Sequence, residues 1–181
     1  MGHPARVILQ EETRAEWVII GQKGEHAEMM GDMIGSNADR IARNSIKPCM
    51  ITGPAFAPIK RILVAYDGSG HASQALHVSV ELAQPLDIPL VAVIVRESGA
   101  ASDPDTVAAD CRKLCSAHGH AVDIIIRDGE PANAILEEAA AHQCNLVLVG
   151  AHGHGRIHEM LLGSTPTQLV TRSDWPVVLV R

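Results

Sequence analysis

The chain has 181 residues, which is more than one average domain needs and fewer than two would fill. Hydrophobic residues make up 46% of it and charged residues 20%, as in ordinary globular proteins, but aromatic residues make up only 2%, which argues against recognition of single-stranded nucleic acid by base stacking. The formal net charge of -6 at pH 7 argues against a protein that coats nucleic acid or membrane surfaces, so we expect neither as a partner.

The N-terminal part of the chain, up to Lys60, is predicted to be a small piece of α/β structure followed by a linker. A strand is predicted around residues 17–21, a helix after Gly35-Ser36, and a second strand around residues 47–51. Residues 54–60 carry two prolines, Pro54 and Pro58, and are predicted to be an interdomain linker that these prolines stiffen.

From residue 61 onward, short apolar runs alternate with amphipathic stretches. Strands are predicted at residues 61–66, 89–95, 122–126, 145–149 and 176–180, and helices at 71–86, 104–118, from 130 onward, and at 165–172. Such alternation is typical of an open, mostly parallel sheet with helices on both faces and right-handed crossovers. We therefore expect a complete five-stranded α/β domain over residues 61–181.

The two parts of the chain contain an internal repeat. The run 17–24 resembles 146–153, Gly35-Ser36 resembles Gly163-Ser164, and 47–51 resembles 175–179. The first copy contains only its last strand, helix and strand. We therefore divide the chain into a partial repeat at 1–53, a linker at 54–60 and a complete domain at 61–181.

Glycines are the strongest chemical signal. Gly150 and Gly153 follow the fourth strand of the complete domain, and Gly163-Ser164-Thr165 precedes its last helix. Open α/β sheets bind ligands beyond the carboxyl ends of their strands, and glycines let main-chain N–H groups approach phosphate oxygens there. The last helix would add its positive amino end. The alternative is that these glycines only form turns.

The spacing of these residues resembles the G-x2-G-x9-G-[ST] motif of the universal stress protein family. The match at Gly150, Gly153, Gly163 and Ser164 is complete, and residues 62–69 resemble the opening strand of that family with its V-x-x-D-x-S segment. The resemblance covers residues 61–181, while residues 15–53 resemble the last third of another copy. It implies a Rossmann-like fold, in a tandem-type member with a truncated first repeat.

The resemblance also implies an ATP site between the first and fourth strands of the complete domain. Asp67 would lie near the adenosine, where it could also hold Mg²⁺ through the phosphates, or it could be only a turn and helix-cap residue. The full set of nucleotide-binding residues that the resemblance implies is Ala65, Tyr66, Asp67, Ile94, Gly150, His152, Gly153, His154, Arg156, Gly163, Ser164 and Thr165.

The matching motif of the first copy is impaired. Ten residues rather than nine separate Gly24 from Gly35, and Glu25, Glu28 and Asp32 lie between them, where negative charge would oppose a polyphosphate. The copy also has no first strand. We predict that it binds no nucleotide and has a structural role.

Other kinds of site have weaker support. The four cysteines form no C-x-x-C pair and fit the pattern of reduced, buried thiols, and the histidines near Gly150 are interpreted as phosphate-side or solvent-exposed residues rather than metal ligands. No P-loop and no G-x-S-x-G elbow occurs, so we assign no catalytic residue. The N-terminus shows no secretory signal pattern, and a cytoplasmic location is the default expectation.

Three functions follow as hypotheses. The first is an ATP-binding module that regulates a stress response with little or no catalysis. The second is a scaffold that dimerises without nucleotide, and the third is a slow ATPase. The terminal strand at 176–180 is apolar and would need a cover, either from residues 49–52 of the same chain or from a second chain. We expect a homodimer or a larger homo-oligomer through the final strands.

Overall fold

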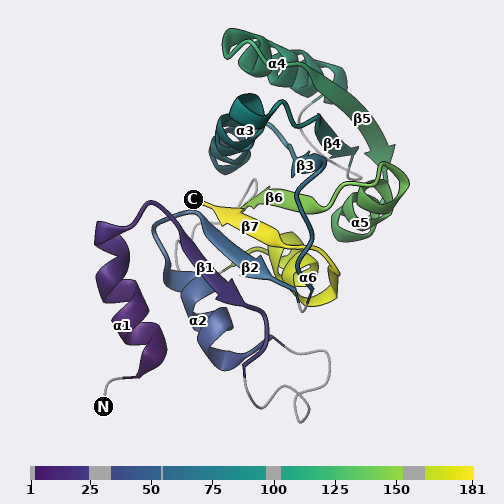
Figure 1. Ribbon diagram of the computed structural model, residues 1–181. Coiled ribbons are helices and arrows are strands. Elements are labelled where there is room, and N and C mark those ends of the chain that lie inside the picture. The colour runs from purple at the N-terminus through teal and green to yellow at the C-terminus, as the bar shows by residue number, and fades with distance from the viewer. Residues whose placement is uncertain (1–2, 25–33, 54, 97–102, 153–161) are drawn as a thin grey trace.

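The computed structural model describes residues 3–24, 34–53, 55–96, 103–152 and 162–181 (Figure 1). The helices are α1 (Pro4–Glu11), α2 (Ser36–Asn44), α3 (Gly70–Ala83), α4 (Pro104–Ala117), α5 (Pro131–Ala141) and α6 (Ser164–Arg172), with short 3-10 turns η1 (Glu12–Arg14) and η3 (Gln84–Leu86). The strands are β1 (Val18–Gly21), β2 (Cys49–Thr52), β3 (Ile62–Ala65), β4 (Leu90–Arg96), β5 (Val122–Asp128), β6 (Leu146–Gly150) and β7 (Val177–Val180).

All seven strands form one sheet in the order β1-β2-β7-β6-β3-β4-β5. The strands β3 to β7 are mutually parallel, as predicted for the complete domain, and β1 is parallel to β2. The expected five-stranded sheet is wrong in its strand count, because β2 pairs antiparallel with β7 and adds two strands. An uncovered apolar edge at β7 would leave main-chain hydrogen-bonding groups unpaired, and β2 satisfies them within the chain.

Helices cover both faces of the sheet, as expected (Figure 1). Apolar residues of α3 and α4 pack on one face, and those of α1, α2, α5 and α6 pack on the other. The apolar cluster on the face covered by α1, α2, α5 and α6 includes Ile41, Ile51, Leu169 and Leu179. The core on this face therefore runs from the N-terminal elements into the C-terminal ones without interruption.

The N-terminal elements begin earlier than predicted. The sequence indicated only a strand, a helix and a strand, but α1 precedes them and packs against α2. Its start, Pro4-Ala5, matches the start of α5 at Pro131-Ala132, where proline suits the first helical turn. The other boundary differences are small. The helix predicted at 71–86 ends at Ala83, because Pro85 imposes a 3-10 turn.

The segments β1-α2-β2 and β6-α6-β7 form the same main-chain hydrogen bonds at matching positions. Gly35 N–H donates to Gln22 O at 2.8 Å, and Gly163 N–H donates to Ala151 O at 3.0 Å. Val18 N–H donates to Pro48 O, and Val147 N–H donates to Pro176 O, both at 3.0 Å. In the β2–β7 ladder Met50 pairs with Val178, its own counterpart in the internal repeat, so a local two-fold axis passes through this pair.

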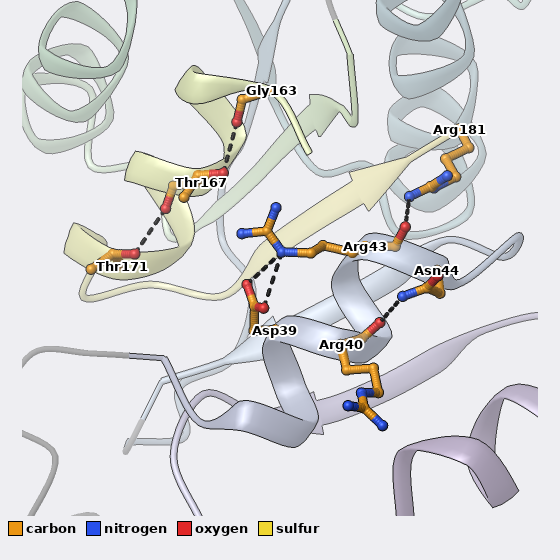
Figure 2. Close-up of polar contacts among 8 residues, drawn as sticks. All are labelled: Asp39, Arg40, Arg43, Asn44, Gly163, Thr167, Thr171 and Arg181. Carbon is orange, nitrogen blue, oxygen red and sulfur yellow. Dashed lines mark hydrogen bonds and ion pairs between the residues drawn. The ribbon is translucent and has the colours of Figure 1, made fainter. Parts of the chain in front are cut away.

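Polar contacts fasten the N-terminal elements to the C-terminal ones. Figure 2 shows the Arg181 guanidinium donating to the main-chain oxygen of Arg43 at the end of α2, while the Arg43 side chain pairs with Asp39. Gln22 Nε2 donates to Val170 O at 2.6 Å at the carboxyl end of α6. These contacts and the β2–β7 ladder hold the two parts together across the linker.

Candidate functional site

The segments that carry the predicted site meet at the carboxyl edge of β3 and β6. These strands are parallel neighbours, with Val64 opposite Leu148, so the turn after Ala65 lies beside the residues after Gly150. The start of α6 approaches the same edge, because Gly163 N–H donates to Ala151 O at 3.0 Å. Three segments that are far apart in the sequence therefore surround one point, the usual ligand position of open α/β sheets.

The turn after β3 is rigidly held. The carboxylate of Asp67 accepts a hydrogen bond from Ser69 N–H at 2.9 Å, and Gly68 has a φ of 81°, in the left-handed region that glycine adopts readily. Ser69 Oγ in turn accepts from Ala72 N–H at 3.2 Å and caps α3. Asp67 therefore performs the turn role that the sequence suggested. The ligand role is compatible with it, because a carboxylate has further lone pairs.

Gly150 is required by packing, whatever its role toward a ligand. A Cβ atom at this position would lie 2.9 Å from the carbonyl carbon of His71 and 3.0 Å from the amide nitrogen of Ala72. The amino end of α3 thus presses directly on the end of β6. The ring of His71 lies against that of His152, with centroids 5.3 Å apart and planes tilted by 52°, and His152 is buried.

The amino end of α6 differs from that of its neighbours. The helices α3, α4 and α5 are capped by the side chains of Ser69, Asp103 and Glu130. The residue at the cap position of α6 is Gly163, which has no side chain to cap the helix. An uncapped helix start leaves first-turn N–H groups for an anion. Ser164, the first residue of α6, is exposed, and Thr165 is half-buried. Helices α1 and α2 also begin without a side-chain cap.

The residues expected near the adenosine, Ala65, Tyr66 and Ile94, do not lie on one face of the sheet. Tyr66 and Ile94 are buried in the cluster under α3 and α4, whereas Ala65 packs on the opposite face of the sheet. The Tyr66 hydroxyl lies 3.5 Å from Ser73 Oγ, and burial raises the pKa of Tyr66. Val95, which follows Ile94, shares the face of Ala65.

The structure thus brings Asp67, Gly150, His152, Gly163, Ser164 and Thr165 to one edge. The side chains of Tyr66 and Ile94 point away into the core, and Gly153, His154 and Arg156 lie outside the described residues. Sequence reasoning missed His71. Its position as the second residue of α3, directly after the Asp67–Gly70 turn, was the available signal.

The matching motif of the N-terminal part lies at the other edge of the sheet, because β2 runs antiparallel to β7. Its Gln22 side chain is engaged with the carbonyl end of α6, and no described strand lies beside β1 in the place that β3 has beside β6. The structural role of this motif stays a prediction.

The thiols form no further site among the described residues. All four cysteines are free and buried, and burial raises the pKa of Cys49 to about 12 and that of Cys144 to about 11. In the described part of the chain no three His, Cys, Asp or Glu side chains are grouped so that they could hold a metal ion. None of the helices described has the length and apolar character needed to cross a membrane.

Comparison with known proteins gives a consistent result. A model of the universal stress protein family matches residues 99–181. A universal stress protein of Thermus aquaticus is 33% identical over an alignment of 135 positions, which covers 67% of this chain and 98% of that protein. A universal stress protein of Synechocystis is 31% identical over 166 residues, which are 91% of this chain. The chain spans only 57% of the length of this second relative.

Solved structures agree in fold. The crystal structure of a universal stress protein from Archaeoglobus fulgidus has a TM-score of 0.77 at 24% identity, covering 99% of this chain and 66% of that one. A universal stress protein in complex with cAMP has a TM-score of 0.58 at 21% identity, covering 69% of this chain and 99% of that one.

Proposed function

The chain belongs to the universal stress protein family, and from that premise we propose that it binds an adenine nucleotide at the carboxyl edge of β3 and β6 and acts as a regulatory module of the stress response. The observation that carries this proposal is the uncapped start of α6, which lies beside the end of β6 and the rigid turn at Asp67. A related protein that was solved with cAMP supports an adenine nucleotide as the ligand.

The phosphates are assigned to the start of α6. The main-chain N–H groups of Ser164 and Thr165 and their hydroxyls can donate to phosphate oxygens, and the helix dipole favours the negative charge. His152, which follows β6 and lies against His71, is assigned to the same edge of the sheet. The proposal extends to Gly153, His154 and Arg156 through the family motif alone.

The adenosine is assigned to the end of β3. Because the Tyr66 and Ile94 side chains are buried in the core, contact falls to Ala65, to Asp67 and to the main chain between them. Asp67 is also the carboxylate that would hold Mg²⁺ when the cation accompanies ATP. The nucleotide then links two neighbouring strands and one helix, so its binding can change the shape of this edge of the molecule.

Nucleotide binding is tested by calorimetry with ATP, AMP and cAMP. The substitution Ser164→Asp puts a negative charge where the phosphates are assigned, so it should abolish nucleotide binding. The same charge is favourable at the amino end of a helix, so the variant should keep the fold. Ser36→Asp is the matched control at the start of α2, and it should bind like the unaltered chain. Equal affinity in all three proteins, or no binding by the unaltered chain, would overturn the proposal.

The two other functions remain as alternatives with their own measurements. Slow hydrolysis of ATP would appear as phosphate release that Asp67→Ala removes. A scaffold that assembles through β7 has less support, since β7 already lies between β2 and β6. Light scattering with and without ATP distinguishes assembly that depends on nucleotide from assembly that does not.

A further inference from the structure

Two exposed histidines meet where α3 and α4 lie side by side on one face of the sheet (Figure 1). His77 lies in the middle of α3, and His118 directly follows the last residue of α4. Nδ1 of His77 is 3.3 Å from Nε2 of His118, whereas the centroids of the two rings are 4.8 Å apart. The nitrogen-bearing edges of the two rings therefore face each other at a surface that solvent reaches.

A carboxylate lies against the far side of the His77 ring. Glu81 comes one helical turn after His77, and its Oε1 is 3.2 Å from His77 Nε2. A carboxylate beside one ring nitrogen favours the proton on that nitrogen, so the lone pair of the neutral ring lies on the other one. Histidines that bind metal ions usually have their far nitrogen held in this way. The lone pair of His77 is thus directed to Nδ1, the nitrogen that faces His118.

The distance between the two facing nitrogens fits a tetrahedral metal ion. Zinc binds imidazole nitrogen at about 2.0–2.1 Å, so two such ligands on a tetrahedral ion lie about 3.3–3.4 Å apart. The distance between His77 Nδ1 and His118 Nε2 is 3.3 Å. A hydrogen bond between the two rings is the alternative explanation of this contact, and it needs no metal ion.

The main chain at His118 is held on both sides. Its N–H donates to Cys115 O at 3.0 Å, and its C=O accepts from Gln84 Nε2 at 3.0 Å. Apolar residues of α3 and α4 also belong to one buried cluster, which fixes the two helices against each other. Ligands on rigid, packed elements keep their geometry, so little rearrangement is needed for both rings to bind one ion.

We propose that His77 and His118 together bind a divalent transition-metal ion of the kind that imidazole prefers, with Zn²⁺ as the best fit to the distance. Glu81 is a positioning residue, because it acts on the ion through the His77 ring. Among the described residues no third His, Cys, Asp or Glu side chain completes the site, so water fills the remaining positions of the ion. The ion bridges α3 and the end of α4.

The site is tested by calorimetry with Zn²⁺ on the chain without an affinity tag, and with Mg²⁺, which prefers oxygen ligands, as the comparison cation. The chain has 10 histidines, so other sites can contribute and the variants must isolate this one. His77→Gln and His118→Gln should each bind one equivalent of Zn²⁺ fewer than the unaltered chain. If either variant keeps this equivalent, or if the unaltered chain binds no Zn²⁺, the proposal is wrong.

His142→Gln is the matched control. His142 also has a glutamate one turn earlier, with 3.2 Å between His142 Nε2 and Glu138 Oε2, but no second histidine of the described residues contacts it. This variant should bind as many equivalents of Zn²⁺ as the unaltered chain. Loss of one equivalent in the control as well would show an unspecific effect of removing a histidine and would contradict the proposed site.

Nuclear magnetic resonance of the ring nitrogens separates a metal site from a plain hydrogen bond. Zn²⁺ should shift the ¹⁵N signals of His77 Nδ1 and His118 Nε2, and Mg²⁺ should not. Glu81→Ala should lower the affinity for Zn²⁺ about tenfold at an unchanged number of equivalents. In its metal-free form the His77 ring should show more of the Nδ1–H tautomer, which a purely structural role of Glu81 would not cause. Unshifted ring signals in the presence of bound Zn²⁺ would place the ion elsewhere and overturn the proposal.

Discussion

Three residues at the candidate site have structural roles in packing and in a turn, in addition to any role in binding. Gly150 allows α3 to approach the end of β6, Gly68 adopts a left-handed φ, and Asp67 holds the turn between β3 and α3. Gly150 is therefore required by the close packing of a helix on a strand, apart from the ligand role proposed for it. Loss of nucleotide binding in a glycine variant would have to be separated from loss of stability.

Gly150 and Gly70 provide a direct comparison. Gly150→Ala should lower the free energy of unfolding by about 2 kcal/mol, because the new Cβ meets main-chain atoms of His71 and Ala72 that cannot move easily. Gly70→Ala adds a Cβ with nothing within 4 Å in the first turn of α3, and it should leave stability unchanged or raise it by up to about 1 kcal/mol. Urea denaturation measures both. Equal effects would contradict the packing role of Gly150.

The two strand-helix-strand segments have the same local design with one difference. After each helix a serine binds the following turn. Ser45 accepts from Lys47 N–H at 3.2 Å, and Ser173 accepts from Trp175 N–H at 3.1 Å. Only Ser45 also donates to a buried carboxylate, that of Glu12, at 2.6 Å. The N-terminal segment thus contains a buried carboxylate that accepts hydrogen bonds from the Ser45 hydroxyl and from Ile46 N–H.

Ser45→Ala and Ser173→Ala should therefore differ. Both lose the turn bond, which is worth about 1 kcal/mol, but Ser45→Ala also removes a donor from the buried Glu12 carboxylate and should cost about 2–3 kcal/mol in total. Thermal unfolding of the two variants gives the comparison. An equal loss in both would mean that other donors, such as Ile46 N–H at 3.4 Å, suffice for Glu12.

At the scale of the whole molecule, one sheet and one core connect the N-terminal elements with the complete α/β domain. The β2–β7 ladder crosses between them, and the cluster around Ile41 and Leu169 includes residues from both. The linker also forms an exposed hydrogen bond to the α/β domain, since Asn145 Nδ2 donates to Pro58 O at 2.7 Å. We infer that the two parts form one cooperative unit.

A cut in the linker tests this unity. A protease site inserted beside Phe56, which is 94% exposed, can be cleaved in the folded protein. The two pieces should elute together from a gel-filtration column, because the ladder and the shared core remain, and they should separate in urea. The same cut in an Ile51→Asp variant should release the N-terminal piece, since Ile51 is buried in the shared core. Separation of the pieces without urea would contradict the inference.

The sequence by itself determined the elements of residues 61–181, their parallel direction and the edge at which the candidate site lies. The reason is local, since apolar periodicity, helix caps and glycine spacing all act over a few residues. The partial internal repeat was visible for the same reason. The helix α1 was missed because the match of Pro4-Ala5 to Pro131-Ala132 is short and lies out of register with the rest of the repeat.

Tertiary structure decided the rest. The sequence pattern could not show whether β7 pairs with β2 or with a second chain. The strands β2 and β7 are both short and apolar, and either pairing would satisfy the main-chain groups of β7. The direction of the Tyr66 and Ile94 side chains depended on which face of the sheet α3 and α4 cover, and the need for glycine at residue 150 depended on the approach of α3. These features result from packing between segments that are distant in the sequence, and no local pattern encodes them.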